Sequence, residues 1–140
     1  GETLARLDLP IHLGEDAGVV IDAEVTERDD RWHLVRVEFA GSSLWVRDNG
    51  LPLGHRARVR ILARDVSLAQ SRGEDTSILN ALPARVSAIA DDTHPAQALV
   101  RLDIGNTPLI ARLTKRSAAQ LAIQPGMDLW AHIKAVALIG

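Results

Sequence analysis

An internal repeat constrains the fold of this 140-residue chain more than any other feature. The sequence LVRVE at residues 34–38 reappears as LVRLD at residues 99–103, an offset of 65. Further along the chain the offset is 72, as Gly54 and Gly126 illustrate. A repeat of this length indicates two copies of one structural unit. The offset grows by seven residues within LTKRSAAQLA at residues 113–122, so the second copy contains an insertion there.

Short runs of alternating apolar and polar residues recur in both copies, which is the pattern of half-buried strands. Turn signals such as Asn49-Gly50 and Pro125-Gly126 separate the runs. Short β-rich runs at close spacing predict an all-β chain of two tandem OB-like small barrels, with one short helix in the second. The hydroxyl of Thr114 is expected to cap that helix. The predicted strands span residues 19–26, 32–39, 44–47 and 57–63 in the first copy and 82–90, 97–104, 109–113, 127–134 and 136–139 in the second.

The polar, glycine-containing stretch 70–75 is the predicted linker between the copies. The first barrel, with an N-terminal arm, then occupies residues 1–69 and the second residues 76–140. Extending the 72-residue offset places Leu62 opposite Lys134, and the first copy also lacks a counterpart of the TKRS segment. We therefore interpret the first barrel as a degenerate copy and the second as the one that carries a site.

Composition argues for a binding module rather than an enzyme. The absence of cysteine excludes thiolate metal sites and cysteine nucleophiles, and the five histidines lack metal-ligand spacing. Neither a paired nucleophile and base nor a cofactor motif is present, so we expect no catalytic residue and no cofactor. A net charge of -2 and an aromatic content of 3% argue against nucleic-acid binding, which depends on neutralising phosphates and stacking bases.

Hydroxyls and cations are densest at Thr114, Lys115, Ser117 and Lys134, all at predicted element ends. A doubly charged tetrahedral oxyanion needs such donors from several directions. Charge-assisted hydrogen bonds contribute roughly 1.5–3 kcal/mol each, so about four to six of them support micromolar or tighter binding. Each residue also has an ordinary reading, with Thr114 as a helix cap and the others as solvated surface residues.

Residues 76–140 resemble the Mop domain, a small barrel that binds molybdate or tungstate in bacterial storage, regulatory and transport proteins. The matching segments are the opening Ser77-Ile78-Leu79-Asn80, the pair Thr114 and Ser117, LAIQPG at residues 121–126, and IKA at residues 133–135. The whole chain resembles the C-terminal di-Mop, or TOBE, region of the ATPase subunit of the bacterial molybdate ABC transporter. One departure is Leu79, where the family has an arginine, so this position can offer a backbone N–H but no guanidinium.

The resemblance implies that molybdate or tungstate is the ligand and that molybdenum is present only as molybdate. It implies binding at an interface between units or subunits, and therefore a homodimer. Expected partners are the chain's own ATPase domain, preceding Gly1, and a membrane permease, in a cytoplasmic location peripheral to the inner membrane. The chain itself would be a regulatory domain and not an enzyme. The implied ligand residues are Ser77, Ile78, Leu79, Asn80, Thr114, Lys115, Ser117 and Lys134.

Two other functions fit parts of the sequence. A structural dimerisation domain of an ABC ATPase, without ligand, is favoured by Leu79 and by the unmatched first copy. An OB-type oligonucleotide-binding module is compatible with the predicted barrels, although the few aromatic residues and the slight negative charge count against it.

Overall fold

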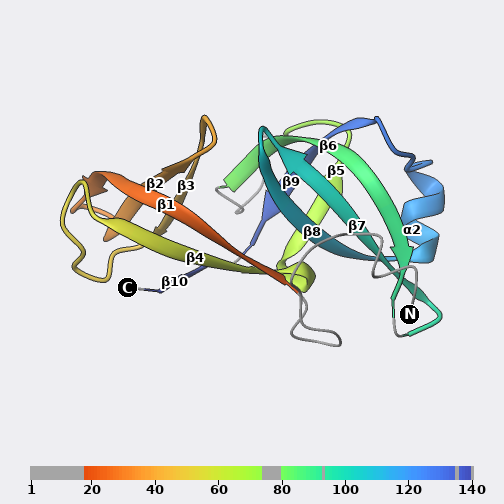
Figure 1. Cartoon of the computed structure of the whole chain (residues 1–140), viewed down its shortest axis with the longest axis horizontal. Helices are drawn as coiled ribbons and strands as arrows, with labels where there is room; N and C mark the ends of the chain where they lie inside the picture. Colours follow the sequence, from red (N-terminus) through yellow and green to blue (C-terminus); the bar gives the residue numbers. More distant parts are fainter. Residues whose placement is uncertain (1–17, 74–79, 93, 135, 140) are drawn as a thin grey trace.

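The computed structural model describes residues 18–73, 80–92, 94–134 and 136–139 (Figure 1). Within them the chain forms two antiparallel five-stranded sheets that lie next to each other, with strand orders β10-β4-β1-β2-β3 and β5-β9-β6-β7-β8. One short helix, α2 (Lys115–Gln120), accompanies the second sheet, and a 3-10 turn, η2 (Ala63–Asp65), follows β4. The predicted class, all-β with two OB-like small barrels and a short helix in the second, is confirmed. The 3-10 turn was not expected.

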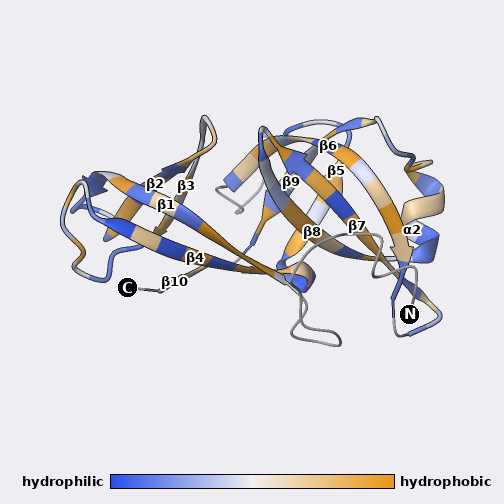
Figure 2. Cartoon of the chain, in the orientation of Figure 1, coloured by the Kyte–Doolittle hydropathy of each residue, from blue (hydrophilic) through white to orange (hydrophobic). Residues whose placement is uncertain are grey.

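The first sheet owes its two faces to strict alternation of residue type. In β4, for example, Ala57, Val59 and Ile61 are buried and the arginines between them are exposed. Figure 2 shows this alternation as bands along the strands. Burying the apolar face of a sheet is what stabilises it. The strands of the first sheet are β1 (Gly18–Asp29), β2 (Leu34–Phe39), β3 (Ser42–Arg47), β4 (Arg56–Leu62) and β10 (Ala137–Ile139).

The second sheet repeats the first, with β6, β7, β8 and β9 in the places of β1, β2, β3 and β4. Equivalent contacts recur, because the Gly54 N–H donates to the Val25 carbonyl and the Gly126 N–H to the Val86 carbonyl, both at 2.7 Å. The duplication and its 72-residue offset are thus confirmed, and the insertion of the second copy forms α2. The strands are β5 (Val66–Ala69), β6 (Asn80–Asp91), β7 (Gln97–Ile104), β8 (Thr107–Thr114) and β9 (Asp128–Ile133).

The two sheets exchange their last strands. β5 follows β4 in the chain but pairs with β9 of the second sheet, whereas β10 pairs with β4 of the first. A hydrogen bond joins the segments that lead into β5 and β10, because the Lys134 N–H donates to the Asp65 carbonyl at 2.8 Å. Buried residues of both sheets form one hydrophobic cluster. The division at residues 70–75 stays a prediction about the duplicated units. Each sheet includes one strand from the other side of this division, β10 in the first sheet and β5 in the second.

Close packing of β1 against β4 makes a prediction at Gly18. A Cβ atom there would lie 2.5 Å from the Ile61 carbonyl oxygen and 3.0 Å from the Leu62 Cα. Because β4 would have to shift, we expect Gly18→Ala to lower the free energy of unfolding by about 1–2 kcal/mol. Val20→Ala is the control, since Val20 on the same strand is 55% exposed. Equal effects of both substitutions in urea denaturation would contradict this account of the contact.

Candidate anion-binding site

A cavity of about 500 Å³ lies where the first sheet meets the start of β6 and the end of β9. The first copy lines it with Trp45, Arg47 and Asn49, and the second copy lines it with Asn80 and Lys134. Two of the predicted ligand residues, Asn80 and Lys134, therefore share one cavity. Among the residues that the structure describes, the lining includes two cations and no carboxylate. This balance of charge suits an anion.

Lys134 directly follows β9. Its backbone N–H is bound to the Asp65 carbonyl, and its side chain is exposed. Among the residues that the structure describes, the Lys134 ammonium group has no ion-pair partner. The anchored main chain and the unneutralised charge leave Lys134 available to an anion in the cavity. Its counterpart at the 72-residue offset is Leu62, the last residue of β4, so the first copy offers no equivalent cation.

Asn80 begins β6 and is only 9% exposed. Its Oδ1 accepts from the Trp45 N–H at 2.8 Å, and its Nδ2 donates to the Trp45 carbonyl at 3.0 Å. Trp45 lies in β3, the edge strand of the first sheet, so the Asn80 amide takes the place of a neighbouring strand. Asn80 thereby ties the second copy to the first. One N–H of its side chain is left over for a ligand.

Three predicted ligand residues lie at the opposite end of the second sheet. Thr114 Oγ1 accepts from the Ser117 N–H at 3.0 Å and donates to Ser117 Oγ at 2.9 Å, which confirms the predicted helix cap. Lys115 Nζ lies 3.4 Å from Asp91 Oδ1 in an exposed ion pair. The other three predicted residues, Ser77, Ile78 and Leu79, lie outside the described residues.

The length of β6 keeps Thr114 and Ser117 away from Lys134. Asp91 ends this 12-residue strand on the β7 side near Thr114, whereas Asn80 begins it next to Ile133. At ~3.3 Å per residue, roughly 35 Å of strand separates the two ends. Figure 1 accordingly shows α2 on the side of the second sheet that faces away from the first. A single chain therefore brings Asn80 and Lys134 together but leaves Thr114, Lys115 and Ser117 apart from them.

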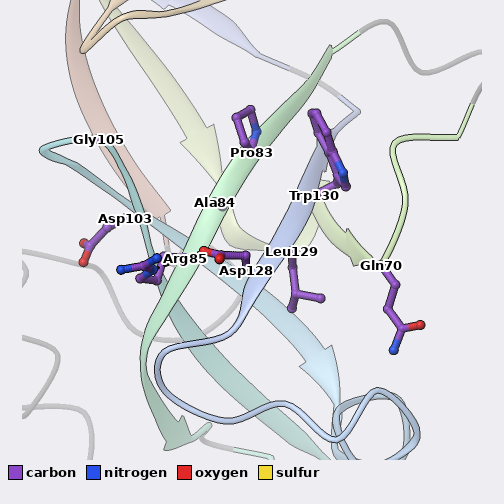
Figure 3. Close-up of a pocket in the computed structure, with 9 residues that line it drawn as sticks. All are labelled: Gln70, Pro83, Ala84, Arg85, Asp103, Gly105, Asp128, Leu129 and Trp130. Atoms are coloured by element: carbon purple, nitrogen blue, oxygen red, sulfur yellow. Dashed lines mark hydrogen bonds and ion pairs between the residues drawn. The ribbon is translucent and has the colours of Figure 1, made fainter.

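A second cavity, of about 490 Å³, lies against β6 and β9 (Figure 3). The one cation among its described lining residues, Arg85, lies between Asp103 and Asp128, with Arg85 Nε 3.1 Å from Asp128 Oδ1. The hydrogen bond to Asp128 and the charge of its carboxylate raise the pKa of Arg85. Because carboxylates already match the cation, this cavity is a poor anion site.

The turn after β3 holds Arg47 and Asn49 in place, and sequence reasoning missed its importance. Asp48 Oδ1 accepts from the Gly50 N–H at 2.8 Å, and Asp48 Oδ2 accepts from Arg28 Nε at 2.9 Å. Arg28 also donates to the Leu51 carbonyl. The Gly50 N–H, and then the Arg28 guanidinium, lower the pKa of Asp48 from its ordinary value of 3.8.

The lowered pKa of Asp48 predicts a pH dependence that is confined to acid. A depressed carboxyl pKa stabilises the fold fully above the unfolded-state value, and this contribution is lost as the pH falls through the lower folded-state value. We expect the melting temperature of wild type to exceed that of Asp48→Asn by a constant amount above about pH 5, and the gap to close toward about pH 2. A gap that stays constant across the acid range in thermal melts would contradict this role.

The described residues contain no group of three or more His, Cys, Asp or Glu side chains placed to hold a metal ion. None of the helices in the described part of the chain has the length and apolar character needed to cross a membrane.

The chain is similar to a domain-family model, to two longer relatives and to a solved structure. Residues 76–140 match the model of the TOBE domain. The chain is 62% identical over 138 residues to the molybdenum import ATP-binding protein ModC of Methylococcus capsulatus, and 64% identical over 140 residues to that of Thiobacillus denitrificans. These matches cover 99% and 100% of this chain and 39% of each relative. A solved structure of the cytoplasmic molybdate-binding protein ModG, with molybdate bound, superposes with a TM-score of 0.72 at 24% identity, covering 94% of this chain and 99% of that one.

The match to the TOBE domain model covers slightly less than half of the chain. The predicted resemblance of the whole chain to the TOBE region of molybdate importer ATPases is confirmed by the ModC relatives. The chain spans about two fifths of the length of these relatives, 39% in both. The likeness to ModG shows that the two proteins share a fold.

Proposed function

We propose that this chain binds molybdate or tungstate as the regulatory region of a molybdate importer ATPase. The observation that carries the proposal is Lys134, whose charge lacks an ion-pair partner among the described residues and faces a cavity whose described lining holds no carboxylate. Two kinds of relative support the choice of ligand: ModC, named for molybdenum import, and ModG, solved with molybdate bound.

Molybdate is a tetrahedral dianion, so its site needs positive charge and N–H or O–H donors on several sides. Lys134 supplies charge, and the remaining Asn80 N–H and the Asn49 amide supply further donors. Tungstate has the same charge and nearly the same shape, so it should bind comparably. Sulfate is smaller and would leave some donors out of reach. Binding involves no covalent step, catalytic residue or cofactor, and the chain itself acts without enzymatic activity.

The separation of the predicted ligands calls for a second copy of the chain. We place Thr114, Lys115 and Ser117 of one subunit against Asn80 and Lys134 of the other, so that the oxyanion lies between the subunits of a homodimer. The backbone N–H groups of residues 77–79 are further proposed donors. In this arrangement the bound anion joins the subunits, which is how occupancy would be sensed.

In the whole protein, the proposed partners are the ATPase domain of the same polypeptide and a membrane permease. The region would work in the cytoplasm, peripheral to the inner membrane through the transporter complex. Its proposed units are residues 1–69 and 76–140, joined by residues 70–75. The relatives named for molybdenum import support this setting.

Isothermal titration calorimetry with molybdate, tungstate and sulfate tests the proposal. We expect saturable heat with molybdate and tungstate, at least about tenfold weaker binding of sulfate, and a larger hydrodynamic mass with molybdate present. No heat with any of the three anions would leave a structural dimerisation domain as the better account. Salt-dependent binding of single-stranded RNA would instead favour an oligonucleotide-binding module.

A further inference from the structure

The first copy also brings a cation to the cavity. Arg47 is the last residue of β3 and lines the cavity together with Lys134. Its side chain is exposed, and it has no ion-pair partner within the described part of the chain. The chain as a whole has a net charge of -2. The pairing of two unneutralised cations in one cavity is therefore a local feature and not a consequence of composition.

The acidic neighbour of Arg47 is already engaged. The Asp48 carboxylate is bound to Arg28 at 2.9 Å and to the Gly50 N–H at 2.8 Å, and it is not among the lining residues. The part of the lining that the structure describes thus presents a formal charge of +2, from Arg47 and Lys134. A dianion would balance this charge completely, whereas a monoanion would leave half of it unmatched.

Backbone contacts before and after Arg47 in the sequence hold it in place. Within the first sheet Arg47 pairs with Leu34 of β2, and the adjacent Asp48 N–H donates to the His33 carbonyl at 2.9 Å. Two residues earlier, the backbone of Trp45 is held by the side chain of Asn80. The strand end that carries Arg47 is therefore fixed before any ligand arrives, which reduces the entropy lost on binding.

We propose that Arg47 is a second cationic ligand of the oxyanion, so that the site is built from both copies of the repeat. This inference rests on the proposed function and deepens it. A guanidinium can donate two parallel N–H groups to two oxygens of one tetrahedral anion, while the Lys134 ammonium acts as a point charge. The first copy, interpreted from the sequence as degenerate, then contributes directly to affinity.

The test compares molybdate affinity by calorimetry in wild type, Arg47→Ala, Arg47→Lys and Arg56→Ala. Arg56 is the matched control, because it is an exposed arginine on β4 that does not line the cavity. We expect Arg47→Ala to weaken binding about fivefold or more, Arg47→Lys to recover part of the loss, and Arg56→Ala to change affinity less than about twofold. Thermal melts check that each variant is folded.

Two results would overturn the inference, and they are distinguishable. If wild type binds and Lys134→Ala weakens binding, but Arg47→Ala behaves like Arg56→Ala, the site exists without Arg47 and the proposed function stands. If folded wild type binds neither molybdate nor tungstate, the proposed function fails and the role of Arg47 fails with it.

Discussion

Lys134→Ala is expected to weaken molybdate binding at least tenfold and to leave the fold intact. The substitution removes a positive charge from a cavity with no carboxylate among its described lining residues, and tenfold corresponds to about 1.4 kcal/mol. The fold should persist because the side chain is exposed and the structural contact, to the Asp65 carbonyl, is made by the backbone N–H. Calorimetry gives the affinity, and a melting temperature within about 2 °C of wild type shows the fold is retained.

Two further variants separate charge from shape at this position. Lys134→Gln keeps most of the length and removes the charge, so it should resemble Lys134→Ala. Lys134→Arg keeps the charge and should retain most of the affinity. Wild-type affinity in Lys134→Ala would show that the cation of the site has been misidentified.

Asn80→Ala is expected to lower the free energy of unfolding by about 2–3 kcal/mol. It removes both hydrogen bonds that join β6 to the edge strand β3 and leaves the Trp45 N–H and carbonyl without their partner. Since these bonds hold the two walls of the cavity together, molybdate binding should weaken as well. Chemical denaturation measures the first effect, and calorimetry measures the second.

The controls for Asn80 lie in the same cavity. Asn80→Asp keeps an acceptor for the Trp45 N–H but buries a carboxylate and sets one of its oxygens against the Trp45 carbonyl, so it should lose at least as much stability as Asn80→Ala. Asn49→Ala removes an exposed amide and should change stability by less than about 0.5 kcal/mol. If Asn80→Ala is no more destabilising than Asn49→Ala, the bridge between the copies is not structural.

Much of the fold was predictable because residue alternation reports directly on strand faces. The bounds of β7, Gln97–Ile104, coincide with the predicted strand, and the insertion inferred from the change of offset forms α2. The exchange of β5 and β10 was not predictable. Alternation specifies which face of a strand is buried but not which strand lies beside it, and β5 has only four residues.

The positions of the candidate site residues in the fold were predictable in part, because repeat offsets and capping patterns are visible in the sequence. The offset singled out Lys134, and the capping pattern identified Thr114. Arg47 lies in the first copy, so the residues unique to the second copy did not include it. The available signal was Trp45 and Arg47 on one face of a strand just before the Asp48-Asn49-Gly50 turn. The separation of Thr114 from Lys134 could not be predicted from the sequence, because it depends on which strands pair in the second sheet.

We propose that a tetrahedral dianion binds in the cavity between the two copies, where Thr114, Lys115 and Ser117 of a second subunit complete the site. Diffraction from crystals grown with tungstate, collected at the tungsten absorption edge, tests it most directly. We expect an anomalous peak in this cavity, with tungstate oxygens within about 3 Å of Lys134 Nζ. A well-ordered structure with no heavy-atom peak beside Lys134, or with its only peak elsewhere, would contradict the claim.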